Sequence, residues 1–163
     1  MKPTLRYLCL SGIFAALVFV CTAFLQIPSH AGYIHVGDAL IYLAACLLPW
    51  PYAMAAGMIG GALADVLTGF AIWAPASLII KGLSVLSFQR QGKIVCLRNM
   101  LALIPAWVLC IGGYYAYEAL ITQNAIAPLA GMVGSLVQCL VSSALFVFLG
   151  YLFDKLNLRR TLL

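Results

Sequence analysis

Glu118 and the aromatic residues before it have the types and spacing that best suit binding of a small molecule. Trp107, Tyr114 and Glu118 stand at positions i, i+7 and i+11, which puts them on one face of a helix. Aromatic rings stack on flat heterocycles, and a carboxylate accepts hydrogen bonds from ring nitrogens. Tyrosines near a helix end are also common at membrane surfaces, and that alternative stays open for Tyr115. We expect Tyr114 and Glu118 to face inward.

A second polar group repeats at helical spacing farther along the chain. Gly131, Ser135, Gln138 and Ser142 are separated by four, three and four residues, so they form one stripe along a helix. Such a stripe either holds neighbouring helices together through hydrogen bonds or forms the wall of a cavity.

Besides Glu118, three charged residues lie within or beside apolar stretches. A charge near the centre of a bilayer costs about 2.5–3.5 kcal/mol on insertion scales, so each of them needs a partner or a cavity. Asp65 and Lys81 flank a short predicted turn, and the long lysine stem can reach back toward the carboxylate. We predict that these two form a structural pair, with contact to a substrate as the alternative. We interpret Asp38 as the N-cap of a helix.

The other reactive residue types form no catalytic pattern. His30 and His35 lie five residues apart on a loop that contains proline and glycine, which is poor spacing for a helical metal pair. The loop is either a lid that contacts a ligand or a plain polar loop. The sequence contains no recognisable nucleophile elbow and no phosphate-binding P-loop. We therefore expect no enzyme activity, no metal and no cofactor. We also expect free thiols, because no C-x-x-C pair occurs among Cys9, Cys21, Cys46, Cys96, Cys110 and Cys139.

The elements that position these residues must be membrane helices. The chain has 163 residues, of which 65% are hydrophobic and 8% charged, with a mean hydropathy of +1.09. A soluble domain is about 45–50% apolar and about 25% charged. We predict an all-α integral membrane protein in which residues 1–163 form a single domain of six transmembrane helices. The expected helices are Tyr7–Leu25, Asp38–Leu48, Tyr52–Thr68, Ala71–Phe88, Asn99–Ile121 and a last helix from after Pro128 to Phe153.

The second of these helices is too short to cross a bilayer alone. At 1.5 Å per residue it spans ~16 Å, about half of the hydrocarbon thickness. It must be sheltered by its neighbours or be extended by the preceding loop.

Basic residues are confined to three places along the chain. They lie before the first helix, between the fourth and fifth helices, and after the sixth helix, and the exception among the nine is Lys81. Six crossings that start inside put the other eight on the cytoplasmic side, as the positive-inside rule requires. We predict a multi-pass plasma-membrane protein with both termini in the cytoplasm. Its surroundings are the lipid bilayer, and no nucleic acid is expected as a partner.

The first helix carries small residues at helical spacing. Ser11 with Ala15, and Gly12 with Ala16, form two adjacent small-x-x-x-small pairs, which allow a second helix to approach closely. The pairs serve either internal packing or docking of a second membrane subunit.

Four motifs occur in an order that resembles the substrate-binding S component of energy-coupling factor (ECF) transporters. They are SGIFAA at 11–16, Gly37-Asp38, GMIGGALAD at 57–65 and IKG at 80–82. The resemblance extends from the first to the sixth helix. It implies a vitamin-binding subunit that depends on a transmembrane coupling (T) subunit and two cytoplasmic ATPases. It also implies docking through an Ala-x-x-x-Ala motif, at whose first position this chain has Gly12 in place of alanine and at whose second it has Ala16.

The resemblance implies a ligand pocket in the outer half of the bundle, closed by the loop between the first two helices. The candidate substrate-binding residues are then His35, Trp73, Ser77, Tyr114, Glu118 and Gln138. Their chemistry suits a flat nitrogen heterocycle, such as a pyrimidine, a pyridoxine-like compound or a queuosine-precursor-like deazapurine. Two alternatives stay open: a small secondary transporter that works alone, and a membrane assembly subunit that transports nothing.

Overall fold

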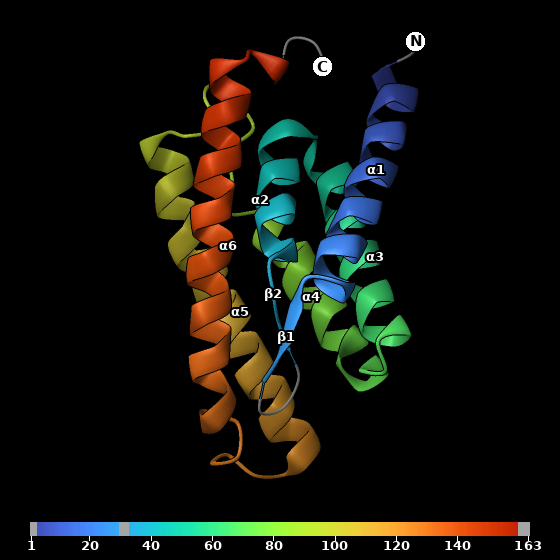
Figure 1. Cartoon of the computed structure of the whole chain (residues 1–163), viewed down its shortest axis with the longest axis vertical. Helices are drawn as coiled ribbons and strands as arrows, with labels where there is room; N and C mark the ends of the chain where they lie inside the picture. Colours follow the sequence, from blue (N-terminus) through green and yellow to red (C-terminus); the bar gives the residue numbers. More distant parts are fainter. Residues whose placement is uncertain (1–2, 30–32, 160–163) are drawn as a thin grey trace.

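The computed structural model of the chain describes residues 3–29 and 33–159. Within these residues, six α-helices form a bundle, with two short strands between the first and second helices (Figure 1). The predicted number of helices is confirmed, and the observed bounds differ from the expected ones by a few residues. The elements are α1 (Pro3–Ala23), β1 (Gln26–Pro28), β2 (Tyr33–His35), α2 (Gly37–Leu47), α3 (Trp50–Leu67), the 3-10 turn η1 (Ala71–Trp73), α4 (Ala74–Val85), α5 (Leu97–Thr122) and α6 (Leu129–Lys155).

Prolines and residues with positive φ set several of these boundaries. Pro51 and Pro75 lie in the first turns of α3 and α4, where the missing N–H has no helical partner to lose. Gly69 has a φ of +88° in the turn between α3 and η1, a conformation that glycine adopts without steric cost. Gln123 ends α5 in the left-handed region, with a φ of 53°.

Helix α2 is the buried centre of the bundle. All eleven of its residues are buried, and α1, α3, α4 and α6 pack around it. Tyr42 on α2 stacks on Phe88, with ring centroids 4.8 Å apart, and meets the edge of Phe146 at 5.9 Å. The neighbours therefore shelter this short helix, as predicted.

Helices α1 and α3 approach each other closely through small residues. A Cβ added at Gly60 would lie 2.6 Å from the backbone oxygen of Ala15, so only glycine permits this approach. One turn away, the Ser11 hydroxyl donates to the backbone oxygen of Tyr52 over 2.7 Å. For the pair Ser11 and Ala15, the alternative of docking is corrected to internal packing, because the Ser11 hydroxyl and the Ala15 backbone contact α3 inside the bundle.

The connection between α1 and α2 folds back on itself as a β-hairpin, which the sequence did not predict. Strands β1 and β2 pair antiparallel, with Gln26 opposite His35 and Pro28 opposite Tyr33. Among the two loop histidines, His35 lies on β2, whereas His30 falls outside the described residues. The hairpin runs along the bundle in front of α4 in Figure 1.

One end of the bundle gathers the basic residues of the described chain, except Lys81. The start of α1, the α4–α5 connection and the end of α6 lie together at the top of Figure 1. Asp154 near the end of α6 binds the α4–α5 connection at this end. Its two carboxylate oxygens accept hydrogen bonds from the N–H groups of Ile94 and Val95 at 3.0 and 2.9 Å.

Three described helices are long and apolar enough to cross a membrane. They span Thr4–Ala23, Leu97–Thr122 and Leu129–Lys155. In the most apolar 18 residues of each helix, only 17–28% are buried inside the protein. An apolar surface of that extent is typical of contact with lipid.

Candidate functional site

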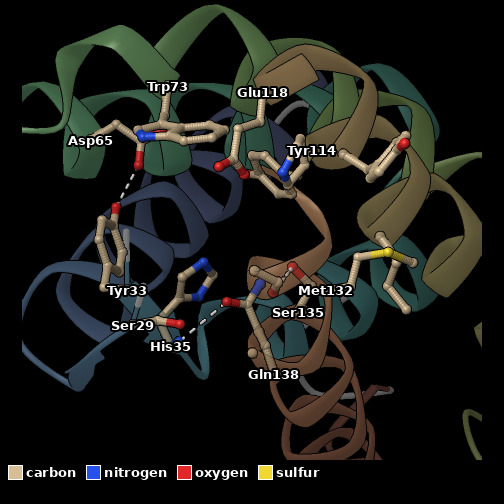
Figure 2. Close-up of a pocket in the computed structure, with 15 residues that line it drawn as sticks. Ser29, Tyr33, His35, Asp65, Trp73, Tyr114, Glu118, Met132, Ser135 and Gln138 are labelled. Carbon is tan, nitrogen blue, oxygen red and sulfur yellow. Dashed lines mark hydrogen bonds between the residues drawn. The ribbon is translucent and has the colours of Figure 1, made fainter. Parts of the chain in front are cut away.

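A pocket opens in the half of the bundle away from the basic end. Fifteen residues line it, from the hairpin, the end of α3, η1, the second half of α5 and the start of α6 (Figure 2). Its volume is about 680 Å³, including the part open to solvent. Five of the six candidate substrate-binding residues lie around it: His35, Trp73, Tyr114, Glu118 and Gln138.

Ser77, the sixth candidate, lies behind the pocket wall. Its hydroxyl is hydrogen-bonded to the Tyr114 hydroxyl at 2.8 Å, and Ser77 itself is buried. It therefore positions a ring that faces the pocket and is not among the residues lining it.

The aromatic wall is built by η1 and α5. The rings of Trp73 and Tyr114 meet edge to face, with centroids 6.0 Å apart. Trp73 also lies against Tyr117, which donates its hydroxyl hydrogen to the backbone oxygen of Ile72. Tyr115 also lines the pocket, and its hydroxyl donates to the backbone oxygen of Ala125 at 2.9 Å. These bonds fix the orientation of the rings.

The hairpin covers the pocket and is held on the α3 side by Tyr33. The Tyr33 hydroxyl donates to the carboxylate of Asp65, and its ring packs on Phe70 with centroids 5.0 Å apart. Burial and the Asp65 carboxylate raise the pKa of the Tyr33 phenol, so Tyr33 remains a hydrogen-bond donor at neutral pH.

On the α6 side, the hairpin is held through His35. The His35 N–H donates to the side-chain oxygen of Gln138 at 3.3 Å. Its ring Nδ1 accepts the N–H of Gly37 at 3.1 Å, which leaves Nε2 as the protonated nitrogen of the neutral ring. Burial, with the Lys81 ammonium close by, lowers the pKa of the imidazole to about 3. His35 is therefore neutral at physiological pH.

The polar stripe of α6 faces the pocket. Gly131, Ser135 and Gln138 all line it. Gly134, beside the stripe, lies directly under the hairpin, because a Cβ there would come within 2.6 Å of the Ser29 hydroxyl. Ser142, the last residue of the stripe, does not line the pocket, and its hydroxyl donates to the backbone oxygen of His35 at 3.4 Å. The stripe is therefore a cavity wall from Gly131 to Gln138, and it also makes hydrogen bonds to neighbouring elements, so both interpretations of its spacing apply.

A buried ion pair lies beneath the pocket, and it corrects two predictions. Lys81 Nζ contacts Asp38 Oδ1 at 2.6 Å, and both side chains are at most 4% exposed. The Gln138 amide donates to Asp38 Oδ2 at 2.9 Å. Lys81 thus pairs with Asp38 and not with Asp65, because Asp38 on the central helix α2 faces α4. Asp38 caps no helix, since Val36 holds the N-cap position of α2 and makes no side-chain cap bond.

Several pocket residues were not identified from the sequence, chief among them Tyr33, and Asp65 was considered for substrate contact only as the alternative to a structural pair. The spacing of Tyr33 and His35 on one strand carried a usable signal, because residues i and i+2 of a strand point to the same face. That signal requires the strand to be recognised first, and a three-residue strand is too short for its periodicity to be seen.

The site holds no metal-binding cluster in the part of the chain that the structure describes. All six cysteines are free. The lining residues can stack on, hydrogen-bond and enclose a ligand.

Comparison with known proteins gives three findings. The family model for the S component of ECF-type riboflavin transporters matches residues 2–155. An uncharacterised protein of Pyrococcus woesei is 29% identical over 133 residues, which cover 80% of this chain and 88% of that protein. A solved structure described as the S component of a bacterial ECF transporter superposes with a TM-score of 0.74 at 17% identity, covering 94% of this chain and 98% of the other. The chain belongs to the family of ECF-type riboflavin transporter S components.

Proposed function

We propose that this protein is the membrane-embedded substrate-binding subunit of an ECF-type importer for a vitamin or a related flat nitrogen heterocycle. The observation that carries the proposal is the pocket. It combines aromatic rings, two carboxylates and an amide under a hairpin cover, in the half of the bundle away from the basic residues. A pocket so placed can take up a polar compound and shield it from lipid.

The chemistry of the pocket favours a heterocycle with hydrogen-bond donors. Trp73 and Tyr114 offer aromatic surface for stacking, and Glu118 and Gln138 offer acceptors. An anionic ligand is disfavoured, because no lysine or arginine is among the lining residues and the nearby Lys81 is paired with Asp38. Riboflavin, which the family name mentions, is one neutral candidate.

The hairpin is the proposed gate of this pocket. Its contacts with Asp65 on α3 and Gln138 on α6 bridge two helices across the ligand space. A ligand enters or leaves only when these two contacts open, so release of the substrate requires movement of the hairpin.

The outward face of α1 is the proposed docking site for the coupling subunit. A Cβ at Gly12 would have no atom within 4 Å, and Ala16 one turn later is also exposed. Small residues on an unpartnered membrane face allow close approach of another helix. The basic end, at which α1 begins and α6 ends, would face the cytoplasm, where two ATPase subunits supply energy.

Transport assays in proteoliposomes test this proposal. We expect uptake of the bound compound only when the coupling subunit and both ATPases are present with ATP. Uptake by the purified chain alone, driven by an ion gradient, would instead support a secondary transporter.

Gly12→Leu separates docking from binding in the same assay. The variant should abolish uptake and leave ligand affinity unchanged, because the added side chain projects away from the bundle. Gly112→Leu on α5 is the matched control, since a Cβ there also meets nothing within 4 Å. Loss of affinity in Gly12→Leu, or equal loss of uptake in both variants, would contradict the docking role.

A further inference from the structure

Asp65 has a carboxylate oxygen that the protein leaves without a donor. Tyr33 donates to Oδ1, whereas Oδ2 is buried and makes no hydrogen bond of good geometry with the described residues. The Ser77 hydroxyl lies near the carboxylate and is hydrogen-bonded to the Tyr114 hydroxyl at 2.8 Å. Asp65 is only 5% exposed and lines the pocket. Burying an unsatisfied acceptor is unfavourable, and a charged one more so. The arrangement therefore indicates a donor that arrives from the pocket.

Glu118 provides a second carboxylate in the same pocket. No donor within the described part of the chain bonds its side chain, and its Oε2 lies 3.5 Å from where a Cβ on Gly131 would stand. The carboxylate therefore lies against α6 near Gly131. In Figure 2 the side chains of Asp65 and Glu118 both reach toward the open space between η1 and α6.

Within residues 3–29 and 33–159, no positive side chain balances these two carboxylates. The pocket lining includes neither lysine nor arginine, and the Lys81 charge beneath it is matched by Asp38 at 2.6 Å. His35 is neutral, as shown above. Carboxylates partly removed from water require a countercharge, and the described residues do not supply one.

The aromatic wall suits the same kind of ligand. A cation over the face of a tryptophan or tyrosine ring is attracted by the ring electrons. Trp73, Tyr114 and Tyr115 line the pocket beside Glu118. Lys81 already uses this interaction from behind the wall, with Nζ 5.3 Å from the Tyr114 ring centroid.

We infer that the substrate is a cationic heterocycle, in which a protonated amine on a flat ring donates to Asp65 and Glu118 while the ring stacks on the aromatic wall. This inference rests on the proposed function and narrows its substrate class. It also gives Asp65 two tasks, because the substrate and the hairpin residue Tyr33 then bind the same carboxylate. Occupancy of the pocket would in this way stabilise the closed hairpin.

Two series of matched compounds test the charge of the ligand. On a pyridine ring, pyridoxamine carries an ammonium group where pyridoxine carries a hydroxyl and 4-pyridoxic acid a carboxylate. On a pyrimidine ring, 4-amino-5-aminomethyl-2-methylpyrimidine is compared with its hydroxymethyl counterpart. Affinities are measured by isothermal titration calorimetry on the purified full chain in detergent at pH 7.5, with riboflavin as the neutral reference.

We expect the amine of at least one series to bind at least about tenfold more tightly than its hydroxyl counterpart, as a charge-assisted hydrogen bond implies. Asp65→Asn and Glu118→Gln should each reduce the affinity for that amine by about tenfold or more. The affinity for the hydroxyl compound should fall by a smaller factor, because the hydroxyl also donates to a carboxylate but carries no charge, so the preference for the amine should shrink. Asp154→Asn at the opposite end is the matched control and should change neither.

Equal or tighter binding of the hydroxyl or carboxylate compounds would overturn the inference, as would failure of both amines to bind. If the amines fail in this way and riboflavin binds, the proposed function holds and the substrate is neutral. If neither riboflavin nor any other compound binds, and no small molecule copurifies with the chain, the proposed function fails as well.

Discussion

Two aspartates at opposite ends of this bundle differ in how many of their carboxylate oxygens receive a hydrogen bond from the protein. Asp154 accepts a backbone N–H on each oxygen, at 3.0 and 2.9 Å, and so fixes the α4–α5 connection to α6. Asp65 accepts one bond, from the hairpin residue Tyr33, and its second oxygen is buried without a donor. A carboxylate with complete hydrogen bonds stabilises the fold, whereas an incomplete one beside a cavity is available to a ligand.

Asp38 shows that burial alone does not distinguish a carboxylate that stabilises the fold from one that is available to a ligand. It is buried more deeply than Asp65, yet Lys81 and Gln138 satisfy both of its oxygens. We therefore assign Asp38 and Asp154 to stability and Asp65 and Glu118 to binding. This assignment predicts different consequences for substitutions of the same chemical kind.

Breaking the buried pair should have the largest effect. Lys81→Met leaves Asp38 charged and unpaired in the core, which costs about 3–5 kcal/mol of unfolding free energy. Thermal unfolding in detergent, followed by circular dichroism, should show a strong loss of stability or no folded protein.

The double variant Asp38→Asn/Lys81→Met is the control for that prediction. It removes both charges and should recover most of the lost stability, because replacing a whole buried pair is often close to neutral. A double variant as unstable as Lys81→Met would mean that the two residues act separately.

Substitutions at the two ends should affect different properties. Glu118→Gln should weaken ligand binding by about 1.5–3 kcal/mol and leave the melting temperature nearly unchanged. Asp154→Asn should lower the unfolding free energy by a similar 1.5–3 kcal/mol and leave affinity unchanged. Titration calorimetry and thermal unfolding on both variants give the comparison. A change of the same property in both would remove the distinction between the two ends.

The smallest predicted effect concerns pH at the pocket end. The pKa of His35 is about 3 in the folded protein and 6.5 when unfolded, so the unfolded state binds more protons between these values. The contribution to stability is complete above pH 6.5 and is lost as pH falls, at about 1.4 kcal/mol per pH unit. Wild type should therefore lose more stability than His35→Asn between pH 6.5 and 5.5. Equal losses would show that His35 is not buried in its neutral form.

The sequence predicted the helices better than the site. Long apolar runs bounded by proline, glycine and charge identify helices directly, and the shelter of the short helix α2 followed from its length alone. The lysine partner was assigned wrongly, because Asp65 lies nearer to Lys81 along the chain. The correct choice depends on which helix occupies the centre of the bundle, and sequence spacing carries no such information.

Within the pocket, helical spacing indicated Tyr114, Glu118 and Gln138, because residues on one helix face can be counted. Tyr33 and Asp65 meet only after the hairpin folds across the bundle. Their contact joins residues 32 positions apart through an irregular connection, for which no local pattern exists. The unsatisfied oxygen of Asp65 is a property of the folded structure alone.

Native mass spectrometry of the purified chain tests the central claim most directly. After incubation with the compounds named above, wild type and Asp154→Asn should each carry one small molecule per chain, and the double variant Asp65→Asn/Glu118→Gln should carry none. Equal ligand occupancy in the double variant and wild type, or a wild-type chain without bound ligand, would contradict a binding site at this pocket.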